Sequence, residues 1–151
     1  MSVKAVLYTD GGARGNPGPA GIGAVLTSPE GDPIGEVSRS LGHTTNNVAE
    51  YEAVIAGLEL ARAKGVTEID ICADSKLVVK QLNGEWKIKN DRLRTLAVKA
   101  RRLMNSFENA RISHVRREKN ERADTLANQA MDEAELSAEL RANTGGKESL
   151  F

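Results

Sequence analysis

The chain has 151 residues, with 21 basic and 21 acidic side chains and a single cysteine, Cys72. A chain of this length forms about one domain with one sizeable core. The single cysteine excludes an internal disulfide, and no apolar run approaches the roughly 20 residues of a membrane span. These properties predict one cytoplasmic domain that does not enter a membrane, and a monomer is the default for a domain of this size.

The first part of the chain has the pattern of three short strands. VKAVLY (3–8) is rich in strand-forming residues and runs into an Asp-Gly-Gly turn signal. The segments 21–28 and 33–41 flank the turn sequence Pro-Glu-Gly-Asp, so we expect an antiparallel meander. The glycines of residues 8–21 lead into a strand and no Gly-Lys-Ser/Thr follows, which excludes a phosphate-binding P-loop.

The rest of the chain alternates helices and strands. A helix is expected from about 46 to 64, capped by Thr44 or Thr45 and closed by Gly65. The later elements are, in order, a strand at 67–74, a helix from 75, a basic helix at 91–108, a strand at 110–115 and a helix at 120–134. This order predicts a five-stranded mixed sheet with helices packed on it.

We divide the chain into a domain of residues 1–140 and a C-terminal tail of residues 141–151. The tail is polar and interrupted by glycine, and it ends in Leu150 and Phe151. These residues either dock on the domain or are disordered, and because two apolar residues end a polar segment, we expect docking.

Four acids occupy positions where a carboxylate is costly. Asp10 and Asp74 follow strands whose ends lie on one edge of the predicted sheet, where sites of α/β folds gather. Glu50 and Asp124 lie on the inward faces of their helices, in line with apolar residues. A carboxylate that faces inward needs a partner or a bound cation.

Each acid taken alone also has an ordinary explanation. Asp10 could begin a turn, Asp74 could cap the next helix, Glu50 could pair with a base, and Asp124 could lie at the surface. Together they would repel one another strongly, and a divalent cation resolves such repulsion. Oxygen ligands without a His or Cys set favour Mg²⁺ or Mn²⁺, and such clusters serve two-metal phosphoryl chemistry.

The charges are distributed unevenly along the chain. Residues 1–75 carry five basic and ten acidic side chains, whereas residues 76–102 carry nine basic and two acidic ones. An acidic half beside a basic patch suits a metal site next to a polyanion-binding surface, although a solvated helix face explains the charges equally well. Trp86 is either a partly buried anchor or a stacking platform. Asn128, one turn after Asp124, either binds a metal-bound water or a phosphate or is an ordinary surface amide.

Four segments resemble type 1 ribonuclease H, the family that cuts the RNA strand of RNA–DNA hybrids. They occur in the family's order and spacing, and they are YTDGGARGNPGPAGIGAVL (8–26), TTNNVAEYEAVIAGLELA (44–61), ADSKLVVKQLNG (73–84) and NERADTLANQA (120–130). The resemblance implies the ribonuclease H-like α/β fold, with three antiparallel strands, then two parallel ones, and helices on both faces. It covers about residues 3–134.

The resemblance also implies the chemistry. The family's four metal-binding, catalytic carboxylates fall on Asp10, Glu50, Asp74 and Asp124, which would hold two Mg²⁺ or Mn²⁺ ions. Asp10 would touch both ions, Glu50 and Asp74 would support the ion near the leaving group, and Asp124 would support the ion that activates water. The products would carry a 5′-phosphate and a 3′-hydroxyl. Glu50 would also accept a hydrogen bond from the ribose 2′-hydroxyl.

Further positions match the family's substrate contacts. The residues implied to line the minor groove of the hybrid are Gly11, Gly12, Ala13, Asn16, Asn46 and Asn47. Trp86, Lys87 and Lys89 would contact the DNA strand.

Two departures from the family pattern affect the expected mechanism. Residues 115–124 are short and contain no His, whereas many members have a catalytic His there, so Arg117, Glu118 or water must serve instead. Residues 84–94 pass directly from Trp86 to the next helix, without the basic insertion of some members. This short form resembles the archaeal-type members, some of which also accept double-stranded RNA.

Two other functions compete with a hybrid-specific endonuclease. The first is a catalytically weak module of the same fold that binds a hybrid or double-stranded RNA, which the four intact acids disfavour. The second is a related exonuclease or transposase-like enzyme, which the NPGPAG and TTNN sequences disfavour.

Overall fold

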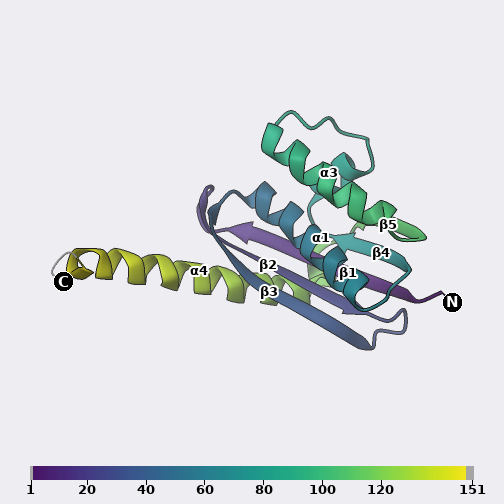
Figure 1. Ribbon diagram of the computed structural model, residues 1–151, viewed down its shortest axis with the longest axis horizontal. Helices are drawn as coiled ribbons and strands as arrows, with labels where there is room; N and C mark the ends of the chain where they lie inside the picture. Colours follow the sequence, from purple (N-terminus) through teal and green to yellow (C-terminus); the bar gives the residue numbers. More distant parts are fainter. Residues whose placement is uncertain (1, 149–151) are drawn as a thin grey trace.

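The computed structural model describes the backbone of residues 2–148 and the side chains of residues 2–143 (Figure 1). The elements in chain order are β1 (Lys4–Ala13), β2 (Gly18–Thr27), β3 (Pro33–Thr44), α1 (Asn46–Ala63), β4 (Glu68–Ala73), α2 (Lys76–Leu82), α3 (Asp91–Asn105), β5 (Asn109–His114), the short 3₁₀ helix η1 (Arg117–Lys119) and α4 (Glu121–Glu148). The predicted order of strands and helices is confirmed.

The five strands form one mixed sheet in the order β3-β2-β1-β4-β5. β1 pairs with β2, and β2 with β3, in antiparallel fashion, while β4 pairs in parallel with both β1 and β5. β1 therefore lies at the centre, between the antiparallel and parallel halves. The predicted mixed sheet is confirmed, and its central strand carries Asp10.

Helices cover both faces of the sheet, and alternate residues of β2 contact a helix on each face. Ala20 and Ile22 pack on the small side chains of α1, whereas the alternate residues Gly21 and Gly23 face α4. A Cβ at Gly23 would lie 2.2 Å from the carbonyl oxygen of Ala123. Glycine is therefore required for the close approach of α4 to this face.

α1 begins and ends where the sequence predicts. The side chain of Thr45 caps the helix by accepting a hydrogen bond from the amide of Val48, at 3.3 Å. Gly65 follows the helix with a φ of +78°, in the left-handed region that favours glycine. Tyr51 and Leu58 are fully buried along its length.

β1 is longer than predicted. Its pairing with β2 continues through Asp10 opposite Gly23 and ends at Ala13 opposite Ala20. The Asp-Gly-Gly sequence is therefore extended strand, because its backbone groups still have partners across the ladder. The chain turns only at residues 14–17, which places the carboxylate of Asp10 within the strand.

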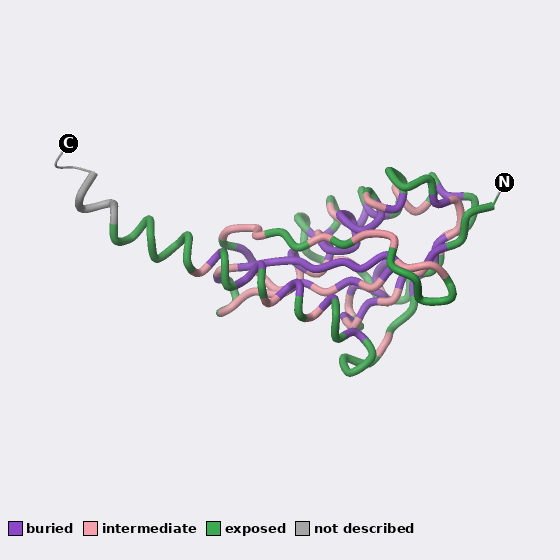
Figure 2. The backbone as a smooth tube through the Cα atoms, turned by 90° about the horizontal axis from the view of Figure 1, so that it is seen from below, coloured by how far each residue is buried: buried purple, intermediate pink, exposed green. Residues whose placement is uncertain are grey.

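The final helix is also longer than predicted, and α3 is slightly shorter. α4 continues to Glu148, far past the expected end at 134, because residues 133–142 are rich in the helix formers Ala, Glu and Leu. It projects beyond the sheet in Figures 1 and 2, and its exposed part includes Leu136 and Leu140. Leu150 and Phe151, which we expected to dock, lie outside the described residues.

Within the described part of the chain, no helix has the length and apolar character needed to cross a membrane.

Candidate active site

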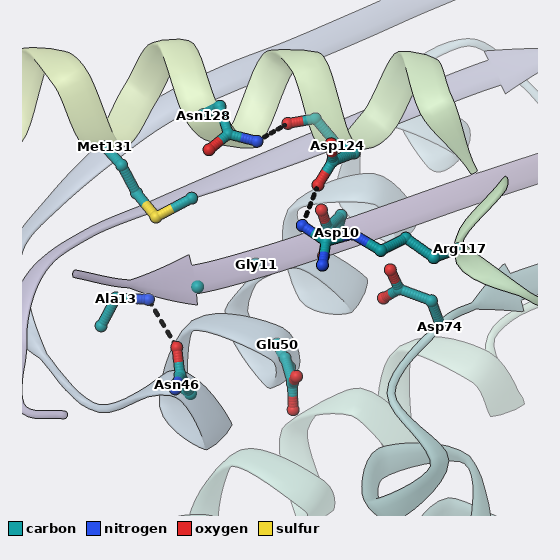
Figure 3. A pocket seen from close by; sticks show the side chains of 11 residues that line it. Asp10, Gly11, Ala13, Asn46, Glu50, Asp74, Arg117, Asp124, Asn128 and Met131 are labelled. Atoms are coloured by element: carbon teal, nitrogen blue, oxygen red, sulfur yellow. Dashed lines mark hydrogen bonds and ion pairs between the residues drawn. The ribbon is translucent and has the colours of Figure 1, made fainter. Parts of the chain in front are cut away.

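The four predicted acids lie around one open pocket of about 430 Å³ (Figure 3). Asp10 comes from β1, Glu50 from α1, Asp74 from the residue after β4, and Asp124 from α4. The structure thus brings together acids that are up to 114 residues apart in the sequence. The full lining is Asp10, Gly11, Gly12, Ala13, Asn46, Glu50, Asp74, Arg117, Asp124, Asn128 and Met131.

Asp10 has the most perturbed carboxyl group of the pocket. Burial, the negative charge of Asp74 and contact with Asp124 raise its pKa from 3.8 to about 8. All these effects act in the same direction, because an anion loses solvation here and faces other anions. The pocket therefore has an excess of negative charge around Asp10.

Glu50 is held by Ser75, the N-cap residue of α2. Burial raises its pKa to about 6, and the nearby charge of Asp74 adds to the rise, while a hydrogen bond from Ser75 opposes it. The Ser75 hydroxyl donates to Oε2 of Glu50 at 2.7 Å. The same hydroxyl accepts from the amide of Val78 and so caps α2. Ser75 therefore makes the cap that the sequence also allowed for Asp74, whose carboxylate lines the pocket.

Ser75 gives a testable prediction at this point. Ser75→Ala should lower the stability by about 1 kcal/mol through loss of the cap, and it should reduce the activity because Glu50 loses its donor. Ser75→Thr keeps the hydroxyl and should restore both properties. The measurements are thermal unfolding and the cleavage rate of a labelled hybrid. Equal activity of the Ala and Thr variants would show that the bond does not orient Glu50.

Asp124 is connected to two neighbours at the pocket wall. Nη2 of Arg117 donates to Oδ1 of Asp124 at 3.3 Å. Nδ2 of Asn128 donates to the backbone carbonyl of Asp124 at 2.9 Å, and its Oδ1 accepts from Arg14 at 3.3 Å. Arg14 also forms ion pairs with Asp132 and Glu135 of α4. These contacts hold α4 against the β1–β2 turn.

The β1–β2 turn is joined to the start of α1 by two asparagines. The amide of Ala13 donates to Oδ1 of Asn46 at 2.7 Å. The amide of Asn46 in turn donates to Oδ1 of Asn16 at 3.0 Å. The polar side chains that we assigned to substrate binding therefore also fix the turn against the helix.

Not every predicted site residue lines the pocket. Asn16, Asn47, Trp86, Lys87 and Lys89 lie outside it. Trp86 is 44% exposed, which fits both a partly buried anchor and a stacking platform. Lys87 and Lys89 are exposed on the same segment.

Sequence reasoning missed two residues of the site. Met131 lines the pocket from α4, and its place on the inward face with Asp124 was visible in the helical spacing. Ser75 was not singled out, although a serine directly after a strand and before a helix is a typical cap.

The donor chemistry of the pocket fits hard divalent cations, because the acids offer only oxygen atoms. As the side chains stand, no group of three or more His, Cys, Asp or Glu among the described residues could hold a metal ion. Arg117 is the cation among the pocket-lining residues, and it is paired with Asp124. The pocket lining has four acids and this one basic side chain, and burial together with the charges of Asp74 and Asp124 raises the pKa of Asp10. The charge and the oxygen ligands of the four acids therefore fit divalent cations. Their carboxylates must move closer to one another to chelate a cation.

Comparisons with known proteins agree with this arrangement. A family model described as "Reverse transcriptase-like" matches residues 8–130. Ribonuclease HI of Halobacterium salinarum is 49% identical over 127 residues, which cover 84% of this chain and 64% of that relative. Ribonuclease HI of Caulobacter vibrioides is 35% identical, and the match covers 89% of this chain and 97% of that relative.

Solved structures are also similar. The N-terminal RNase H domain of a Mycobacterium tuberculosis protein matches with a TM-score of 0.89 and 48% identity, over 91% of this chain and 99% of that one. LC11-RNase H1, solved in complex with an RNA/DNA hybrid, matches with a TM-score of 0.82 and 44% identity, over 86% of this chain and 98% of that one.

The length of the chain relative to its curated relatives varies. The chain spans 64% of the Halobacterium salinarum relative and 39% of a Mycobacterium tuberculosis relative described as a bifunctional protein. The matching family model nevertheless covers most of the chain, and the structural matches reach nearly the full length of the solved domains. On this basis the chain belongs to the ribonuclease H family, as a short type 1 member of archaeal-like form.

Proposed function

We propose that the protein is an endonuclease that hydrolyses the RNA strand of RNA–DNA hybrids with two divalent cations, Mg²⁺ or Mn²⁺. The observation that carries this proposal is the convergence of Asp10, Glu50, Asp74 and Asp124 on one open pocket. The family relationship and the hybrid-bound LC11-RNase H1 support the choice of substrate. The proposal includes 5′-phosphate and 3′-hydroxyl products and a cytoplasmic monomer.

The four carboxylates are the proposed cation ligands, with Asp10 central because it lies in the middle strand of the sheet. When bound, the cations would supply an activated water and stabilise the leaving oxygen. The side chains of the protein position the ligands and the substrate. Ser75 orients Glu50, and Glu50 is the proposed acceptor for the ribose 2′-hydroxyl, which distinguishes RNA from DNA.

The β1–β2 turn and the start of α1 are the proposed contact to the minor groove of the hybrid. Gly11, Gly12 and Ala13 present backbone without large side chains at the pocket rim. Asn46 accepts from Ala13 through its oxygen, so its amide nitrogen is oriented to donate. Asn16 and Asn47 lie beside this rim rather than in the pocket. Asn128 is the proposed phosphate contact from α4.

The DNA strand is proposed to lie on the segment that carries Trp86, Lys87 and Lys89, all of which are exposed. Exposed aromatic and basic side chains suit stacking and backbone contacts. Residues 115–124 contain no His, so product release is assigned to Arg117 and Glu118 of η1, of which Arg117 reaches Asp124.

A cleavage assay with matched substrates tests the proposal. We expect Mg²⁺- or Mn²⁺-dependent cutting of the RNA strand in an RNA–DNA duplex and no cutting of a DNA–DNA duplex. A matched RNA–RNA duplex shows whether double-stranded RNA is accepted. A circular hybrid separates an endonuclease from an exonuclease, which needs a free end. Tight binding of the hybrid without cleavage would contradict the proposed enzyme activity and favour a binding module of the same fold.

A further inference from the structure

The segment of residues 84–90 has no helix or strand of its own, yet it is tied to the domain. It forms the loop that arches over α3 in Figure 1. The amides of Glu85 and Trp86 both donate to the carbonyl of Lys80, at 2.9 and 3.2 Å. Nε of Arg94 donates to the carbonyl of Ile88 at 2.6 Å. The segment is therefore held in one shape by its two flanking helices, α2 and α3.

The middle of this segment is held by Gln81, a buried residue of α2. Nε2 of Gln81 donates to the carbonyl of Lys87 at 3.3 Å, and its Oε1 accepts from the hydroxyl of Tyr51 at 2.6 Å. Nη2 of Arg101 donates to the backbone carbonyl of Gln81 at 2.7 Å. Gln81 is 5% exposed and Tyr51 is fully buried. A buried side-chain amide is costly unless it is hydrogen-bonded. In Gln81 both the nitrogen and the oxygen of the amide have partners.

The Tyr51–Gln81 bond joins α1 to α2. The bond from Ser75 to Glu50 in the candidate active site joins α1 to the N-cap residue of the same helix. Glu50 and Tyr51 are neighbours in α1, and Ser75 and Gln81 lie six residues apart, which is a rise of roughly 9 Å along a helix. The two bonds therefore hold the loop segment and one candidate catalytic carboxylate on the same helix pair.

We infer that the buried Tyr51–Gln81 pair is a positioning device that fixes residues 84–90 and presents Trp86 and Lys87 to the DNA strand of a bound hybrid. This inference rests on the proposed function. The pair acts through the carbonyl of Lys87 and touches no substrate. A loop that is already ordered loses less conformational entropy on binding, so the pair sets the affinity for the hybrid rather than the rate of cleavage.

The order of the loop can be measured without any substrate, because Trp86 is the only tryptophan of the chain. Gln81→Glu keeps the acceptor for Tyr51 and removes the donor to Lys87. Tyr51→Phe removes the hydroxyl that holds Gln81. Both variants should lower the fluorescence anisotropy of Trp86 and increase its quenching by acrylamide. Asn83→Ala is the matched control, since Asn83 donates from the end of α2 to Ile112 of β5 instead of to the loop.

Steady-state cleavage of a hybrid supplies the second measurement. Both variants should raise KM roughly 3–10-fold, because one or two side chains must then be ordered when the hybrid binds. The kcat of both variants should stay within about twofold of the wild type. Combining Gln81→Glu with Trp86→Ala should shrink the effect of Gln81→Glu on KM, because the two residues act through one contact. Asn83→Ala should leave KM unchanged.

Three results would overturn the inference. They are unchanged Trp86 anisotropy in both variants, unchanged KM, or a fall in kcat at constant KM. A wild-type protein that cleaves no hybrid would instead overturn the proposed function. In that case the anisotropy measurement alone still decides whether the Tyr51–Gln81 pair fixes the loop.

Discussion

Replacing Asp10 with asparagine is expected to abolish cleavage and, without divalent cations, to raise the melting temperature. Asp10 is the proposed central ligand, so the loss should be roughly 10³-fold or more, the equivalent of several kcal/mol of cation-assisted catalysis. Asparagine has nearly the same shape and no charge, so it removes the cost of burying a carboxylate and its repulsion from Asp74 and Asp124. The gain in stability should be about 2–4 °C in melting temperature for each kcal/mol recovered.

The gain depends on pH in a defined direction. The folded-state pKa of Asp10 is raised from 3.8 to about 8, so the unfolded chain ionises first as the pH rises. The metal-free wild type should therefore lose stability between about pH 4 and pH 8, and the Asn variant should lack this loss. The difference between the two melting temperatures should be small near pH 4 and largest above pH 8.

Thermal unfolding in EDTA at several pH values and a hybrid cleavage assay check both parts of this prediction. Asp32→Asn is the control for the loss of one negative charge, because Asp32 is exposed in the β2–β3 turn. Retained cleavage in Asp10→Asn would contradict the assignment of the active site. If Asp10→Asn lowered the melting temperature at every pH, the ionised Asp10 would not destabilise the metal-free fold through its burial and its acidic neighbours.

Gly23→Ala is expected to damage both stability and activity, although residue 23 is outside the pocket. Gly23 lies directly opposite Asp10 in the β1–β2 ladder. A Cβ there would lie 2.2 Å from the carbonyl oxygen of Ala123 and 2.7 Å from the amide nitrogen of Ala127. Both atoms are backbone, so α4 must move away from the sheet by about 1 Å to reach normal contact distance.

The movement carries Asp124 away from Asp10, because Asp124 lies in the same turn of α4 as Ala123. Overpacking of this kind costs about 1–3 kcal/mol, and a displacement of about 1 Å at a catalytic group costs about 10²-fold in rate. Gly35→Ala is the control, since its Cβ would meet only the movable end of Leu60 at 3.3 Å. Wild-type melting and cleavage in Gly23→Ala would show that this contact does not set the position of α4.

Local sequence patterns were sufficient for much of the fold. The Thr45 cap and Gly65 bound α1 as expected, because each acts on the backbone within a few residues. The end of β1 was placed too early, since the glycines after Asp10 are paired by β2, a partner that local patterns do not contain. The end of α4 was also placed too early, at 134, although the Ala-, Glu- and Leu-rich residues 135–142 favour a longer helix.

The sequence by itself determined the order of the elements, the family and the four acids, because these follow from residue periodicity and from motifs with fixed spacing. Only the tertiary structure decided which hydrogen-bond partners meet. Ser75 reaches Glu50 across 25 residues, and Tyr51 reaches Gln81 across 30. Such pairs leave no periodic trace, because one buried donor and one acceptor satisfy each other wherever packing brings them together. The raised pKa of Asp10 has the same origin, since its burial and its acidic neighbours arise only when the strands and helices are assembled.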